Sequence, residues 1–205
     1  MMKMIKVMKM MTSKQKDYFT TRQAAKLLGV AVSTIQLWTN NGLLKAWTTT
    51  GGHRRITRSS ALDLHNKQQA ILNDKNPGKN LSIVVVEDDP QQLRLYEKQL
   101  LGWSADINLV LANDGYDGLV KIGITLPDII ITDLNMPNID GFQMINRLKN
   151  MPALDHSLFI VITGLLEDEI KARGGLPKGV HCYTKPVQFK ELEPLFHQKV
   201  QSMTA

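Results

Sequence analysis

The 205-residue sequence contains a single cysteine, Cys182, and no long hydrophobic run. One cysteine cannot form a disulfide within the chain, and this suits the reducing environment of the cytosol. No apolar run approaches the roughly 18 residues of a membrane-spanning helix. The Met- and Lys-rich opening lacks the apolar core of roughly 7 to 15 residues that a signal peptide requires. These absences predict a cytoplasmic protein without membrane contact.

Acidic residues are scarce in the first part of the chain. Residues 1–80 hold 3 Asp and Glu against 14 Lys and Arg, whereas residues 81–205 hold 16 against 11. Such an imbalance is typical of a polyanion-binding module joined to an acidic one. A solvated basic surface would give the same counts, so the motifs must decide between the two interpretations.

Four apolar runs in the second part of the chain each lead into polar residues. The runs and the residues that follow them are Ile83–Val86 before Glu87, Asp88 and Asp89; Ile129–Ile131 before Thr132 and Asp133; Leu158–Ile162 before Thr163; and Val180–Tyr183 before Thr184 and Lys185. Continuous β-branched runs predict strands buried on both faces of a parallel sheet. Because parallel strands end at one edge of the sheet, we expect these polar side chains to lie together there.

The grouped side chains suggest phosphate chemistry. Clustered carboxylates suit Mg²⁺, which prefers one or two carboxylates, several waters and a phosphate oxygen. A hydroxyl and an ammonium opposite them can bind the other oxygens of a phosphoryl group. Each residue taken singly could also be a helix-capping, strand-end or surface group.

This set of residues resembles the receiver domain of two-component response regulators, over roughly Leu81 to Ala205. The resemblance implies that Asp133 accepts a phosphoryl group from a histidine kinase or a phosphotransfer protein. It implies that Glu87, Asp88, Asp133 and the backbone carbonyl of Asn135 hold Mg²⁺. Thr163 and Lys185 would bind the phosphoryl oxygens.

The alternation of strands and helices predicts an α/β doubly wound parallel sheet, and the resemblance implies the flavodoxin-like strand order 2-1-3-4-5. The expected helices are Gln91–Leu101 with an apolar face of Leu93, Tyr96, Leu100 and Leu101; Asp117–Ile124; Phe142–Leu148; and Phe189–Met203 with Leu192, Phe196 and Val200 facing inward. Ile107–Ala112 is the expected edge strand. Two glycines and a proline in 174–179 predict that the helix after Thr163 ends early.

The first part of the chain contains two short helical segments joined by a turn. Thr20 and Thr21 are hydroxyl caps before an apolar face that ends at Gly29, and a second helix is expected over roughly Val32 to Asn40, with Ile35 and Trp38 in the core. Two short strands, Leu43–Trp47 and His53–Ile56, should flank the Thr-Gly-Gly turn, before a helix capped by Ser59 or Ser60.

This pattern resembles the MerR/excisionase-type winged helix-turn-helix, whose second helix enters the major groove of DNA and whose wing lies on adjacent phosphates or in the minor groove. The residues that the resemblance places on bases are Ser33, Thr34, Gln36 and Leu37, and those that it places on phosphates are His53, Arg54 and Arg55. Ser33 and Leu37 stand where this family commonly has arginine. Two strong contacts to guanine or phosphate are therefore missing.

The sequence thus predicts a basic, disordered tail (1–17), a winged helix-turn-helix (18–72), a linker (73–80) and a receiver (81–205). The expected function is that of a bacterial, non-enzymatic, DNA-binding response regulator. Mg²⁺-dependent phosphorylation would change homodimerisation and hence transcription. The alternative is an excisionase-like architectural protein whose receiver is a phosphorylation-independent docking or dimerisation platform. A Mg²⁺-dependent hydrolase is a third interpretation, less favoured because the receiver resemblance explains every acidic residue.

Overall fold

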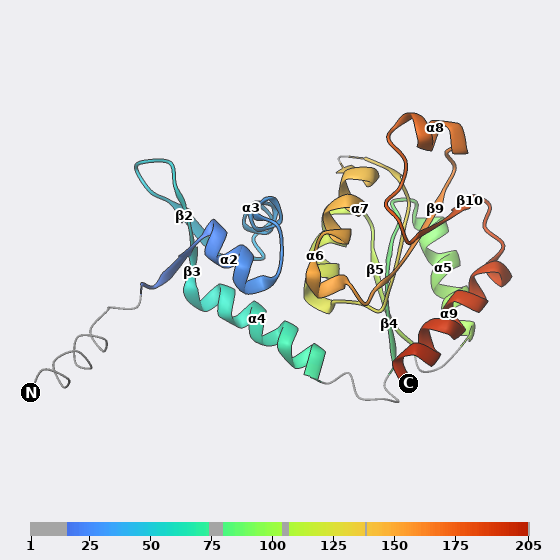
Figure 1. Ribbon diagram of the computed structural model, residues 1–205, viewed down its shortest axis with the longest axis horizontal. Helices are drawn as coiled ribbons and strands as arrows, with labels where there is room; N and C mark the ends of the chain where they lie inside the picture. The colour runs from blue at the N-terminus through green and yellow to red at the C-terminus, as the bar shows by residue number, and fades with distance from the viewer. Residues whose placement is uncertain (1–15, 74–79, 104–106, 138, 205) are drawn as a thin grey trace, which may run out of the picture.

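The computed structural model describes residues 16–73, 80–103, 107–137 and 139–204, which form a small N-terminal unit and a larger α/β unit (Figure 1). The predicted tail and linker lie almost entirely outside these ranges. Among the described residues, no helix combines the length and apolar character needed to cross a membrane.

The N-terminal unit contains three short strands and three helices. They are β1 (Tyr18–Thr20), α2 (Thr21–Leu28), α3 (Val32–Asn40), β2 (Ala46–Thr48), β3 (Arg54–Thr57) and α4 (Arg58–Asn73). At the start of α2, Gln23 N–H donates to Thr20 Oγ1 (3.2 Å) and Thr20 N–H donates to Gln23 Oε1 (2.9 Å), which is a capping box. Gly29 ends α2 with a φ of 66°, a left-handed conformation that glycine adopts without strain. The helix-turn-helix prediction is confirmed.

The antiparallel sheet of this unit has the order β1-β3-β2. The sequence prediction missed β1, which pairs Tyr18 with Thr57, because a three-residue strand is too short to show a periodic pattern. It also began the first wing strand too early. Leu44 is buried in the core, and β2 begins only at Ala46.

The α/β unit is built around five parallel strands. Its elements are β4 (Leu81–Val86), α5 (Pro90–Trp103), β5 (Ile107–Ala112), α6 (Gly115–Thr125), β6 (Ile129–Thr132), β7 (Asn135–Met136), β8 (Ile139–Asp140), α7 (Gly141–Lys149), η1 (Pro152–Leu154), β9 (Leu158–Thr163), α8 (Glu167–Ala172), β10 (Val180–Thr184) and α9 (Phe189–Thr204). The order is β5-β4-β6-β9-β10 across the sheet, which confirms the predicted 2-1-3-4-5 topology with β5 at an edge. A short hairpin, β7-β8, follows β6.

Helices cover both faces of the sheet, with α6 and α7 on one side and α5 and α9 on the other (Figure 1). The α5/α9 side buries Tyr96, Leu100, Leu192 and Phe196. On the α6/α7 side, one apolar cluster includes Leu119, Ile122 and Met144 and continues into the N-terminal unit through Ile35 and Trp38. The two units therefore share a core on that side.

Two residues expected to face inward do not. Leu101 is 48% exposed and Val200 is 44% exposed. Leu101 follows the buried Leu100, and a step of about 100° around the helix carries it away from the sheet. Val200 lies eight residues after Leu192, and two steps of four residues rotate its side chain by about 80°. The early end of the helix after Thr163 is confirmed, since α8 stops at Ala172 and Gly174 and Gly175 have positive φ angles.

Candidate functional site

The carboxyl ends of four strands place the predicted polar residues at one edge of the sheet. Strand β4 leads into Glu87 and Asp88, and β6 leads into Asp133. Thr163 is the last residue of β9, and Lys185 follows β10 and donates its backbone N–H to the Thr163 carbonyl oxygen (2.8 Å). Parallel pairing of the strands produces this convergence.

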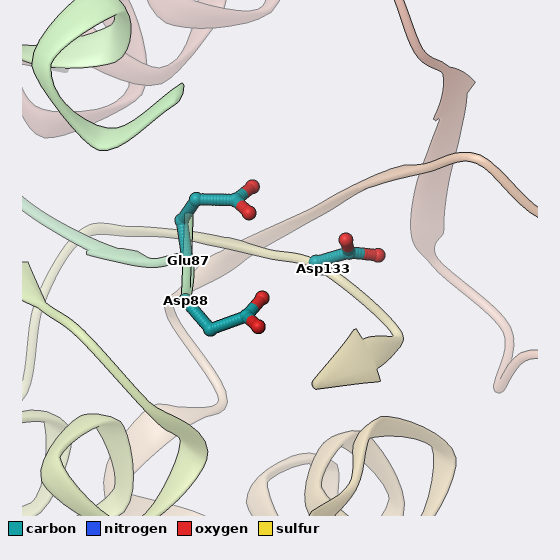
Figure 2. Close-up of side chains that lie close together, drawn as sticks. All are labelled: Glu87, Asp88 and Asp133. Atoms are coloured by element: carbon teal, nitrogen blue, oxygen red, sulfur yellow. The ribbon is translucent and has the colours of Figure 1, made fainter. Parts of the chain in front are cut away.

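Three carboxylates form the centre of the site. One oxygen each from Glu87, Asp88 and Asp133 lies within 4.8 Å of the other two. Figure 2 shows Glu87 and Asp88 extending from adjacent positions toward Asp133 on the neighbouring segment. Glu87 is 2% and Asp133 is 6% exposed. Like charges this close repel each other, so the cluster favours a nearby cation or protonation of one of its carboxyls.

Lys185 supplies one positive charge. Its Nζ lies 2.7 Å from Asp133 Oδ2 and 2.8 Å from Glu87 Oε2. Burial opposes the charge on this ammonium, but its hydrogen bonds to Asp133 and Glu87 outweigh burial and raise its pKa above the usual value. Burial also raises the pKa of the Glu87 carboxyl, and the bond from Lys185 offsets only part of that rise. One ammonium against three carboxylates leaves an excess of negative charge.

The second oxygen of Asp133 is fixed by the backbone. Its Oδ1 accepts the N–H groups of Leu134 (2.5 Å) and Asn135 (3.1 Å). The carboxylate is thus held between two backbone donors on one side and the Lys185 ammonium on the other. The buried Gly141 makes this turn possible, because a Cβ there would overlap the Leu134 backbone.

The donor set of the cluster fits Mg²⁺. Magnesium prefers hard oxygen ligands and is usually held by one or two carboxylates together with water and phosphate oxygens. Glu87, Asp88 and Asp133 supply such oxygens, whereas Asp89 caps α5 by accepting the N–H of Gln91 (2.8 Å). The residues present are therefore compatible with the cation that the sequence predicts.

The two remaining predicted site residues lie beside the cluster. Thr163 is fully buried, and its Oγ1 accepts the N–H of Leu165 (3.3 Å). Asn135 is exposed in β7, two residues after Asp133. Its backbone carbonyl belongs to the segment that leaves the acidic cluster.

The residues predicted to contact DNA lie in α3 and the β2-β3 wing, but they do not all face outward. Gln36 and His53 are exposed, Ser33 is half-buried, and Thr34 is only 2% exposed. Thr34, which the resemblance places on bases, is thus buried in this structure. Leu37 is half-buried and packs against the shared core.

The wing arginines are partly engaged within the unit. Arg54 Nη1 donates to the Gln36 carbonyl oxygen (3.1 Å) and to Thr39 Oγ1 (2.5 Å), so the wing is tied to α3. The guanidinium of Arg55 lies over the Tyr18 ring, 5.3 Å from its centroid, which is a cation–π contact.

Sequence reasoning missed Gln68. This α4 side chain is 3% exposed and donates its Nε2 to the carbonyl oxygen of Gly123 in α6 (2.8 Å). The contact joins residues 55 positions apart. The sequence signal that could have indicated a buried face here is the apolar pair Ala61 and Leu64, seven and four residues before Gln68.

A parallel α/β sheet with an acidic cluster and a lysine at its carboxyl edge is a receiver-like arrangement. The sequence matches the response regulator receiver domain family over residues 83–196 and a helix-turn-helix domain family over residues 18–60. The chain belongs to the response regulator receiver family, with a helix-turn-helix domain before the receiver.

Named relatives agree with this assignment. Protein PilG of Pseudomonas aeruginosa is 32% identical over 127 residues, covering 60% of this chain and 90% of PilG. The transcriptional regulatory protein TrcR of Mycobacterium tuberculosis is 26% identical over 153 residues, covering 71% of this chain but 54% of TrcR, so the chain spans about half of that protein.

Solved structures show the same fold. The signal receiver domain of a DNA binding response regulator protein (merR) from Colwellia psychrerythraea 34H is 27% identical and superposes with a TM-score of 0.53, covering 60% of this chain and 99% of that one. A Francisella response regulator receiver domain gives a TM-score of 0.51 at 24% identity, covering 60% and 98%.

Proposed function

We propose that the protein is a phosphorylation-controlled DNA-binding regulator and that Asp133 is its phosphoryl acceptor. The observation that carries this proposal is the Asp133 carboxylate, held 2.7 Å from the Lys185 ammonium inside a cluster of three carboxylates. An oxygen of Asp133 attacks phosphorus, a P–O bond forms, and the bond from phosphorus to the donor breaks. A phosphohistidine in a kinase or phosphotransfer protein loses its P–N bond in this way.

The surrounding residues each stabilise a different part of the phosphoryl group. Glu87, Asp88, Asp133 and the Asn135 carbonyl are the residues that would hold Mg²⁺, which when bound neutralises charge on the phosphoryl oxygens. Lys185 shifts from its bonds with Glu87 and Asp133 to a phosphoryl oxygen, and the Thr163 hydroxyl donates to another. The buried position of the cluster strengthens these interactions.

The N-terminal unit provides the DNA-binding surface of this regulator. In this proposal Gln36 and Ser33 of α3 contact bases, while His53, Arg54 and Arg55 of the wing contact phosphates. Phosphorylation in the cytosol would change homodimerisation and so pair two winged units on DNA. The proposed domains are a tail over 1–17, the winged unit over 18–72, a linker over 73–80 and the receiver over 81–205.

The direct test is incubation with Mg²⁺ and a small phosphodonor, followed by intact mass measurement and by DNA binding of the treated protein. We expect an added mass of one phosphoryl group, its loss when EDTA is present, and a change in DNA affinity. An unchanged mass in excess Mg²⁺ would contradict the proposal and favour the phosphorylation-independent architectural protein.

Replacing Asp88 by Asn should weaken Mg²⁺ support of the reaction without removing the acceptor. The change removes one charge from the cluster, so we expect the Mg²⁺ concentration for half-maximal labelling to rise at least tenfold, or about 1.4 kcal/mol. Labelling rates across a Mg²⁺ titration measure this effect. The matched control is Asp89→Asn, just outside the cluster, whose titration should follow the wild type. A curve for Asp88→Asn that overlays the wild type would remove this residue from the site.

Replacing Cys182 by Tyr should enlarge the response of dimerisation to phosphorylation. Receivers commonly have an aromatic residue three positions before the lysine, but here that position holds the small, exposed Cys182. Tyr183 packs against the α5/α9 side of the core, and neighbouring strand residues face opposite ways, so it cannot substitute. Moving a two-state receiver from 1:99 to 99:1 takes about 5.5 kcal/mol, and a thiol couples the pocket to the outer face only weakly.

Analytical ultracentrifugation with and without fluoroberyllate measures this response. We expect a modest shift toward dimer for the wild type and for the size-matched control Cys182→Ser, and a larger shift for Cys182→Tyr. Complete conversion of the wild type from monomer to dimer would show that the missing aromatic does not limit the response.

A further inference from the structure

Helix α3 of the N-terminal unit is packed against the receiver. Trp38 of α3 is fully buried, and Gly123 of α6 lies directly against its ring. The three heavy atoms nearest to a Cβ built at position 123 all belong to Trp38, and a side chain there would overlap the ring. A glycine inside a helix costs stability, by roughly 1 kcal/mol relative to alanine. Here the glycine provides the space that lets the two units come together.

A second contact lies beside the first. The buried Gln68 of α4 donates its Nε2 to the backbone carbonyl of the same Gly123 (2.8 Å). This carbonyl belongs to α6, and its neighbour Ile124 also packs against the shared core. The contact therefore combines an apolar contact with a buried hydrogen bond, which favours one fixed arrangement of the units.

The docked side of α3 includes a residue predicted to read DNA. Leu37 lines a hollow together with residues of α6, β8 and α7: Tyr116, Leu119, Ile139, Asp140, Gln143, Met144 and Arg147. The major groove is about 12 Å wide, so a helix that enters it has DNA against its outer face and along both of its sides. The receiver and DNA therefore compete for the surface around Leu37.

We propose that the α6–α7 side of the receiver is a docking surface for α3, where Gly123 leaves space for the Trp38 ring. This contact blocks DNA binding in the unphosphorylated protein. The inference rests on the proposed function of α3. The segment after Asp133 connects the two sites, because Met136 of β7 is buried in the same cluster as Trp38, and Ile139 of β8 lines the hollow with Leu37. Movement of this segment on phosphorylation of Asp133 releases α3.

The test uses Gly123→Glu in the full chain, with Gly102→Glu as the matched control. Gly102 also lies in a helix, α5, but no described atom lies within 4 Å of a Cβ built there, so the control adds the same charge without a clash in the described part of the chain. Binding to a short duplex of randomised sequence at low salt is compared with tryptophan fluorescence, measured with Trp47 and Trp103 replaced by Phe so that Trp38 is the remaining tryptophan. Circular dichroism verifies that each variant is folded.

We expect Gly123→Glu to red-shift the fluorescence and to bind the duplex about tenfold more tightly than the wild type, whereas Gly102→Glu changes neither. Gln68→Ala, which does not introduce a clash, should tighten binding by about three- to tenfold. Fluoroberyllate with Mg²⁺ should shift the wild type in the same direction and leave Gly123→Glu nearly unchanged.

Two outcomes overturn the inference. A wild-type emission spectrum in Gly123→Glu means that α3 is not docked in solution, and a red shift with unchanged or weaker DNA binding means that docking does not block DNA. If neither the wild type nor any variant binds the duplex, the proposed DNA-binding function itself fails, together with the inhibition.

Discussion

Asp133→Ala is expected to take up no phosphoryl group under conditions that label the wild type completely. Asp133 is the carboxylate held between the Lys185 ammonium and two backbone N–H donors, and no other described carboxylate has this combination. Intact mass after incubation with Mg²⁺ and a small phosphodonor gives the result directly. Because the variant removes one of three crowded negative charges, we expect its thermal unfolding temperature to match or exceed that of the wild type.

Asp89→Ala is the matched control for this loss. Asp89 is exposed, lies two residues after Glu87 and caps α5, so its replacement costs helix stability of about 1 kcal/mol but leaves the cluster intact. We expect wild-type labelling of this control. Labelling that persists in Asp133→Ala would place the acceptor elsewhere and would reject the proposed roles of Lys185 and Thr163.

The receiver site was predictable because its residues follow buried strands. Apolar runs such as Ile129–Ile131 favour the middle of a parallel sheet, and the topology then brings the strand ends together. The same reasoning could not determine how the side chains share hydrogen bonds. Lys185 bridges Glu87 and Asp133 because of the geometry of the side chains, and the spacing of residues along the sequence does not reveal this geometry.

Predictions in the N-terminal unit were less complete, for a physical reason. Its elements are short, so helix and strand periods extend over only a few residues. The strand β1 was missed, and Thr34, which was expected to face bases, is buried. Periodicity showed that Trp38 is buried but not which part of the chain covers it. The partner, Gly123, carries no side chain and therefore leaves no signal in the apolar pattern.

Replacing both Arg54 and Arg55 by Ala is expected to weaken DNA binding by roughly 10- to 100-fold on all sequences alike. The arginines of the wing contact phosphates in the proposed function, and each phosphate neutralised by the protein adds about 0.9 to the slope of log K against log salt. The variant should therefore flatten that slope by about 1.8. Titrations of a duplex over a range of salt concentrations measure both quantities. The control Lys98→Ala with Lys190→Ala removes the same charge from exposed positions on α5 and α9 and should leave the slope unchanged.

The two arginines should differ when replaced singly. Among the described residues, the Arg55 side chain donates to the Arg54 carbonyl and stacks on Tyr18, so Arg55→Ala should remove one phosphate contact and reduce the slope by about 0.9. Arg54 also ties the wing to α3 through Gln36 and Thr39. Lysine retains the charge but not the forked donor geometry, so Arg54→Lys should keep the slope while lowering affinity. If Arg54→Lys or the double Ala variant instead changes the ranking of sequences and leaves the salt dependence intact, the wing reads bases, and DNA recognition in this protein is distributed between the wing and α3.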